Sequence, residues 1–180
     1  MVLLTNKVLS KSFFVKPTLK VANDLLGKYL IRKIGKKEIA CKIIEVEAYD
    51  GPKDKASHAS NGKTTRNKIM FEEGGCFYIY LVYGMHYMLN VVTGEKNYPE
   101  AVLIRGIECN GKIISGPAKL TKFLKIDKKS NSKKAEKKTN LWFEDRGEKL
   151  NKKHIIRTPR IGVDYAGPIW SKKLYRFLVK

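Results

Sequence analysis

Two glutamates stand two residues apart in the segment KIIEVEAYDG, at positions 45 and 47. Side chains at i and i+2 of a strand point to the same face, so Glu45, Glu47 and Tyr49 share a face opposite the apolar residues between them. A carboxylate on this face, next to a loop that contains His58, could act as a general base. The spacing of about 6 to 7 Å along a strand would also permit the paired carboxylates of a glycoside hydrolase. The remaining interpretation is an edge strand with a solvated acidic face.

The segment CFYIYLVYGMHYMLNVV, residues 76–92, predicts a β-hairpin with polar-tipped rings on one face. Tyr78 and Tyr80 alternate with Phe77, Ile79 and Leu81, so one face of the first strand carries phenols and the other is apolar. We expect the apolar face to pack in the core.

The turn of this hairpin carries two large side chains. Gly84 permits a tight turn and leaves Tyr83 and Met85 at the tip. An apolar wedge on a rigid hairpin of a basic protein suits insertion into a base stack. The alternative is a tip that packs against the sheet. Asn90, on the return strand, is either a satisfied core amide or a reader of a base edge.

The charge of the chain indicates an anionic partner. Lys and Arg number 37 against 17 Asp and Glu, which gives a formal net charge of +20. Nucleic acid is the leading partner for such a chain, and solubility alone is the alternative. No run approaches the ~18 apolar residues of a membrane helix, and MVLLTNKVLSKSFF is too short and polar for a signal peptide. We expect no membrane association and a cytoplasmic location, at the nucleoid in a prokaryote or in the nucleus of a eukaryote.

Metal, nucleophile and phosphate-loop motifs are missing from the sequence. No GxGxxG, P-loop or HxxxH pattern occurs, and the three histidines are scattered. We expect neither a metal nor an organic cofactor. The cysteines have no metal-binding spacing, so we expect buried thiols in a reducing cytoplasm. They are Cys41, Cys76 and Cys109.

Hydrophobic periodicity places these residues on a mixed set of elements. Strands and helices do not alternate in a βαβ pattern, which favours one α+β domain over residues 1–180, with a curved, largely antiparallel sheet flanked by helices and a protruding hairpin. A low-complexity basic run at 127–139 predicts a solvated, mobile loop. The other expected elements are a helix at 16–27, strands at 29–34 and 38–49, a long polar loop at 50–68, a strand at 101–108, a helix at 115–126 with Pro117 in its first turn, and two strands within 154–179.

Several sequence blocks closely resemble, in order, those of the alkyladenine (3-methyladenine) DNA glycosylase family. The blocks are EVEAYDGPKDKASHA, TTRNKIMF, FYIYLVYGMHYMLNVV, AVLIRGIE, SGPAKL and RIGVDYAG. The resemblance extends from about Leu9 to Val179. It implies a single mixed domain that binds the DNA minor groove and turns a damaged purine out of the duplex into an aromatic pocket.

The resemblance also implies a role for individual residues. Glu47 corresponds to the general base that activates water, with Arg105 and the main-chain carbonyl of Ile161 holding that water. The remaining correspondences are Tyr49, His58 and Tyr80 as walls around the flipped base, Asn90 as the residue that clashes with the exocyclic amine of guanine, Tyr83 as the intercalating wedge with Met85 beside it, and Thr64, Arg66 and Gly162 as contacts to the DNA backbone.

The sequence therefore predicts a monofunctional DNA glycosylase of base excision repair. Its expected substrates are purines of the 3-methyladenine, 7-methylguanine, hypoxanthine and ethenoadenine type in double-stranded DNA, and it is expected to act as a monomer and leave an abasic site. The alternative is a non-catalytic basic module that stacks bases on the same rings. Glu47 separates the two, because a carboxylate aimed at a polyanion hinders binding unless it does chemistry. A glycoside hydrolase using Glu45 and Glu47 gives no reason for the positive charge.

Overall fold

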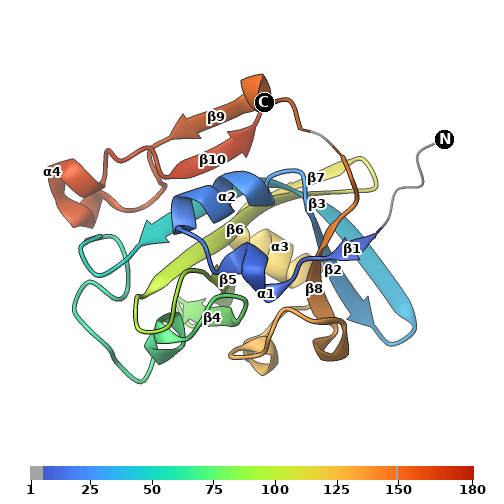
Figure 1. The fold of residues 1–180 in the computed structure, drawn as a ribbon, viewed down its shortest axis with the longest axis horizontal. Coiled ribbons are helices and arrows are strands. Elements are labelled where there is room, and N and C mark those ends of the chain that lie inside the picture. The colour runs from blue at the N-terminus through green and yellow to red at the C-terminus, as the bar shows by residue number, and fades with distance from the viewer. Residues whose placement is uncertain (1–5, 149) are drawn as a thin grey trace.

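The computed structural model describes residues 6–148 and 150–180, and within them ten strands form one open antiparallel sheet. The strand order is β1-β8-β2-β3-β6-β5-β4, while β10 pairs with β3 and β9, and β7 pairs with β6 (Figure 1). The predicted α+β fold with a largely antiparallel sheet is confirmed. The strands are β1 (Lys7–Val8), β2 (Tyr29–Ile34), β3 (Lys37–Asp50), β4 (Phe77–Val82), β5 (His86–Val92), β6 (Glu100–Cys109), β7 (Lys112–Ser115), β8 (Leu141–Asp145), β9 (Ile155–Thr158) and β10 (Arg176–Val179).

Short helices cover this sheet. Pro117 lies in the first turn of its helix, as expected, and Gly27 takes the left-handed conformation (φ 79°) after the helix that precedes β2. None of the helices in the described residues is long and apolar enough to span a membrane. The helices are α1 (Lys11–Phe14), α2 (Thr18–Leu25), α3 (Pro117–Phe123) and α4 (Gly167–Trp170).

The long strand β3 is central to the sheet. Its first half pairs with β2, and its second half, which carries Glu45 and Glu47, lies between β6 and β10. The register against β6 shifts on both sides of Glu45, which marks a bulge. The interpretation of this segment as an edge strand with a solvated acidic face is therefore wrong.

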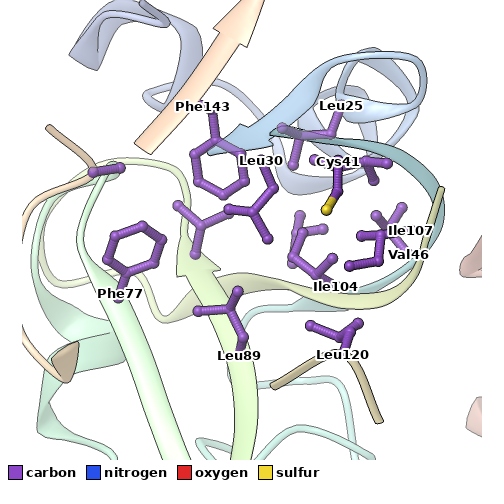
Figure 2. Close-up of a cluster of buried hydrophobic side chains, with 14 of the residues drawn as sticks. Leu25, Leu30, Cys41, Val46, Phe77, Leu89, Ile104, Ile107, Leu120 and Phe143 are labelled. Carbon is purple, nitrogen blue, oxygen red and sulfur yellow. The ribbon is translucent and has the colours of Figure 1, made fainter. Parts of the chain in front are cut away.

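One large apolar cluster holds the sheet and two helices together. Figure 2 shows Leu25 of α2 and Leu120 of α3 among side chains from β2 to β6 and β8. Phe77 and Ile79 of the hairpin belong to this cluster, as expected, while Leu81 is 40% exposed because the hairpin has left the core by that point. The opposite face of β4 carries a second cluster that includes Tyr78 and Tyr80.

Two of the three cysteines are not free thiols. Cys41 on β3 and Cys109 on β6 lie opposite each other with Cα atoms 4.5 Å apart and are joined in a disulfide. The expectation of three buried thiols is therefore wrong for this pair. The cysteines are 68 residues apart in the sequence, but antiparallel pairing of β3 with β6 brings them together. Cys76 is free and partly buried.

The basic run at 127–139 is ordered against the sheet and differs from the expected mobile loop. The Phe77 N–H donates to the Lys133 carbonyl (2.8 Å), and the Ser132 N–H donates to the Phe77 carbonyl (2.9 Å). Ala135 extends this pairing to Gly75 (2.8 Å). The physical reason is that β4 ends the sheet, and its open edge has backbone groups that need partners.

Candidate active site

Glu47 is completely buried on β3 and is surrounded by donors. Its Oε1 accepts the Ile161 N–H at 2.8 Å, and its Oε2 accepts the Tyr49 hydroxyl at 3.0 Å. The Arg105 Nε lies 3.4 Å from Oε1. Burial raises the Glu47 pKa above its ordinary value, although Arg105, Ile161, Tyr49 and Arg160 oppose that rise. Glu47 is thus a desolvated carboxylate whose charged form is still supported by hydrogen bonds.

Glu45 occupies a different environment from Glu47. Its Oε1 accepts the Arg105 Nε at 3.1 Å and the Arg176 Nε at 2.7 Å. Gly106 opposite leaves no room for a side chain, because a Cβ there would stand 2.9 Å from the Glu45 Cβ. Glu45 therefore ties Arg105 to the sheet, and two guanidinium groups hold its carboxylate.

The structure brings Ile161 to Glu47 through its amide. The resemblance assigned the Ile161 carbonyl to a water molecule, and that role stays a prediction. The contact present is the N–H bond to the carboxylate, from a segment 114 residues away in sequence.

An aromatic cavity of about 40 Å³ is lined by Tyr49, whose hydroxyl donates to Glu47, while Glu47 itself lies behind that ring and does not line the cavity. The cavity adjoins a wider surface groove, because Tyr49, His58, Tyr80 and Tyr165 line both. The structure thus brings together the four residues that were expected to surround the base, which are Tyr49, His58, Tyr80 and Asn90. The lining of the cavity consists of Tyr49, Ala56, His58, Met70, Tyr78, Tyr80, Asn90, Ala101 and Tyr165.

His58 is held in the cavity wall by two tyrosines. Its Nδ1 lies 2.9 Å from the Tyr78 hydroxyl, and its ring meets the Tyr80 ring edge to face with centroids 4.5 Å apart. Burial, and then Arg66, lower the His58 pKa, while burial raises the pKa of Tyr78 to about 12. The imidazole and both phenols are therefore neutral near pH 7, and the wall presents neutral ring faces.

Asn90 is both a satisfied core amide and part of the cavity lining. Its Nδ2 donates to the Tyr78 carbonyl at 3.0 Å, and the side chain is buried. The two interpretations of this residue are thus compatible. Its effect on guanine stays a prediction.

The hairpin tip projects into solvent. Tyr83 is 87% exposed and Met85 is 69% exposed, so the interpretation of a tip packed on the sheet is wrong. Tyr83 has φ 51° and Gly84 has φ 69°, and the Met85 N–H donates to the Val82 carbonyl at 3.1 Å. A left-handed conformation costs a tyrosine about 1–2 kcal/mol, so the turn accepts strain at the residue that it exposes.

The expected DNA-backbone contacts are all exposed at or near the groove. Arg66 and Gly162 line it, and the Arg66 guanidinium lies 5.3 Å from the centroid of the Tyr80 ring. Thr64 begins a turn in which its N–H donates to the Asn67 Oδ1 at 2.6 Å. Their contacts with phosphates stay predictions.

Sequence reasoning missed three side chains of the site. Tyr78 alternates with Tyr80, and that alternation was a usable signal. Tyr165, 71% exposed, donates to the Ala56 carbonyl at 3.0 Å across the cavity mouth. Arg160 is buried behind Tyr49, with its guanidinium 4.8 Å from the ring centroid. No local pattern pointed to Arg160 or Tyr165, because their partners are distant in sequence.

Acidic, histidine and cysteine side chains do not gather into a metal site. Within residues 6–148 and 150–180, no group of three or more of them is placed to hold a metal ion. The groups that line the cavity are aromatic rings, the Asn90 amide, the Met70 thioether and two alanines.

Comparison with known proteins agrees with this geometry. A family model described as "Methylpurine-DNA glycosylase (MPG)" matches residues 12–180. This chain belongs to that family. The match covers the whole site, from Glu47 to the segment of Ile161. The protein is thus a DNA glycosylase, an enzyme of DNA repair that binds DNA.

Bacterial and archaeal relatives share most of the chain. A protein of Borreliella burgdorferi is 43% identical in an alignment of 180 positions that covers 96% of each chain. One of Methanocella arvoryzae is 43% identical in an alignment of 176 positions that covers 89% of this chain and 86% of its own. One of Legionella pneumophila is 41% identical in an alignment of 175 positions that covers 96% of this chain and 94% of its own. Each has the printed name "Putative 3-methyladenine DNA glycosylase".

Replacing Tyr49 by Phe removes one donor from Glu47 and keeps the ring. Because the hydroxyl lowers the Glu47 pKa, its loss raises that pKa further. If Glu47 must be ionised, the acid limb of the pH profile of single-turnover base release moves to higher pH. Tyr29→Phe is the matched control, because Tyr29 donates to Glu148 outside the cavity. An acid limb that stays at the parent pH in Tyr49→Phe would contradict the assignment.

Proposed function

We propose that this glycosylase turns an alkylated or deaminated purine out of duplex DNA into the aromatic cavity and hydrolyses its N-glycosidic bond with a water activated by Glu47. The observation that carries the proposal is a buried carboxylate that accepts two hydrogen bonds and pairs with Arg105, and that is joined through Tyr49 to a cavity of neutral rings and a groove reaching the exposed Tyr83. The expected substrates are 3-methyladenine, 7-methylguanine, hypoxanthine and ethenoadenine.

Extrusion of the base is the first step. An enzyme that acts on a base must take it out of the stack, which costs a few kcal/mol and least for a damaged or mispaired base. Tyr83, held outward by its turn, would fill the gap that the base leaves. The surface groove lined by Tyr83, Arg66 and Gly162 leads from the wedge to the cavity, and it would follow the minor groove of the duplex.

The ring faces of the cavity then select the base. Stacking on aromatic side chains contributes about 1–3 kcal/mol per base. Tyr49, Tyr80 and His58 are available for such stacking. A purine with positive charge gains further from the negative faces of the tyrosine rings. Alkylation at N3 or N7 gives a purine this charge and also makes it a better leaving group.

Hydrolysis follows from the position of Glu47. As the N-glycosidic bond breaks, the purine leaves with the bonding electrons and positive charge develops on the sugar. The Glu47 carboxylate stabilises that charge and takes a proton from the water whose oxygen bonds to C1′. A carboxylate of raised pKa is a stronger base once ionised, so its burial favours this proton transfer.

A single chain supplies every group in this scheme. The donors around Glu47, the cavity lining and the wedge come from the described residues of one copy, which supports action as a monomer. Among the described residues no lysine lines the cavity or the surface groove, so the proposed reaction stops at an abasic site. The net charge of +20 supports binding to duplex DNA.

The Glu47→Gln variant tests the catalytic role. It keeps the size of the side chain but has no carboxylate, so we expect it to bind lesion-containing duplex and to release base at least ~100-fold more slowly. Single-turnover release and duplex affinity are the measurements. Glu144→Gln is the matched control, because Glu144 is also buried and bonded to Arg146, far from the cavity on β8. Release by Glu47→Gln at the parent rate would remove this residue from the mechanism.

The Tyr83→Ala variant tests the wedge. Loss of a stacked ring worth about 1–3 kcal/mol should slow excision from duplex DNA by roughly 5- to 150-fold. The same variant on a single-stranded oligonucleotide is the control, because no stack has to be opened there and the rate should match the parent. Equal excision from duplex DNA by the variant and the parent would count against an intercalating role.

A further inference from the structure

Arg160 is a buried arginine with a nearly complete set of partners. Its guanidinium donates to the Asp54 carboxylate from both terminal nitrogens, Nη1 and Nη2, and the Nη2 to Oδ1 distance is 2.8 Å. The Nη1 also donates to the Ala48 carbonyl at 2.9 Å, and the Nη2 to the Trp170 carbonyl at 3.3 Å. Both side chains of the pair are completely buried. Removing one partner of such a pair leaves an uncompensated charge in the interior, so its geometry is strongly fixed.

The Arg160 guanidinium lies close to the two groups that donate hydrogen bonds to Glu47. It is 4.8 Å from the centroid of the Tyr49 ring, whose hydroxyl donates to Glu47. The next residue in the chain, Ile161, donates its N–H to the other oxygen of the same carboxylate. Arg160 thus supports both hydrogen-bond donors of Glu47 without a hydrogen bond to Glu47 itself.

Asp54 connects the same pair to the cavity. It lies in the loop after β3, where its carboxylate accepts the Asp50 N–H and the Ala56 N–H, each at 3.0 Å. Ala56 lines the cavity, and His58 follows two residues later. The Asp54–Arg160 pair therefore joins the loop that holds the flipped base to the segment that contacts the catalytic carboxylate.

We propose that Arg160, anchored by Asp54, is a positioning residue for base release: it holds the Tyr49 hydroxyl and the Ile161 amide against Glu47. This inference rests on the proposed role of Glu47. A lysine cannot replace the arginine, because an ammonium makes neither the two-nitrogen pair with a carboxylate nor the planar stack on a ring. If the pair only stabilised the fold, its loss would change stability and leave the pH dependence of the chemistry unaltered.

Single-turnover base release by Arg160→Lys tests the proposal. We expect release at least tenfold slower at saturating enzyme, lesion-duplex affinity within about threefold of the parent, and an acid limb at higher pH. The limb moves upward because weaker donors no longer lower the Glu47 pKa. The other charged or titratable groups facing Glu47 are Arg105, Tyr49, Tyr80 and Tyr165, and all are retained in this variant.

A control variant of another arginine and a second variant of the Asp54–Arg160 pair show whether the effect on base release is specific to this pair. Arg157→Lys is the control. Arg157 also lies over a ring, 4.8 Å from the centroid of Phe177, but it is exposed on β9. Base release by Arg157→Lys should equal release by the parent. Asp54→Asn removes the anchor and keeps the arginine, and it covers the case in which Arg160→Lys does not fold. We expect the same slow release from Asp54→Asn. The acid limb is compared only in Arg160→Lys, because loss of the Asp54 charge leaves the Arg160 charge uncompensated and by itself lowers the Glu47 pKa.

Parent-like release and an unmoved acid limb in a folded Arg160→Lys variant, or parent-like release by a folded Asp54→Asn variant, would overturn the positioning role. The Glu47→Gln variant, measured in parallel, separates the two levels of inference. If Glu47→Gln releases base at the parent rate, the proposed catalytic function fails. If Glu47→Gln is inactive and both variants of the pair match the parent, only the positioning role fails.

Discussion

A buried carboxylate sets the main physical requirement of this structure. Transfer of an unpaired charged group to the protein interior is very costly, so Glu47 can stay ionised only if donors surround it. Its partners come from three places: the Tyr49 hydroxyl from its own strand, the Arg105 guanidinium from β6 and the Ile161 amide from the segment after β9. The sheet must therefore hold β3 between β6 and β10 to keep Glu47 ionisable, and this pairing is the one observed.

The division of the hairpin between two faces follows from the same sheet. Phe77 and Ile79 anchor β4 in the large core, so Tyr78 and Tyr80 must face the cavity on the other side. Backbone bonds from residues 132–135 and the side chain of Asn131 cover the free edge of β4. The cavity wall thus follows from the alternation of β4, and the exposure of Tyr83 follows from the turn after it.

The sequence predicted which face of each strand is apolar, but it did not predict which strands pair with each other. Alternation in residues 44–49 and 76–92 predicted both strands, their apolar sides and the hairpin tip. The ordered motifs predicted the family and four residues of the cavity, Tyr49, His58, Tyr80 and Asn90, but not Tyr78 or Tyr165. Period two says which side a residue faces and nothing about which strand lies beside it. The pairing of Cys41 with Cys109, the cover on the edge of β4 and the Asp54–Arg160 pair, 106 residues apart, all depend on strand order. They were therefore visible only in three dimensions.

Base release from a panel of lesion duplexes tests the central claim most directly. Purified protein is incubated with duplexes that each contain one 7-methylguanine, hypoxanthine or ethenoadenine, and with an undamaged duplex, and the strands are then examined with and without alkali. We expect a strand break at the lesion in at least one damaged duplex, only after alkali, and none in the undamaged duplex. Absence of any alkali-labile site in every lesion duplex, or a break formed without alkali, would contradict a Glu47-activated water that leaves an abasic site.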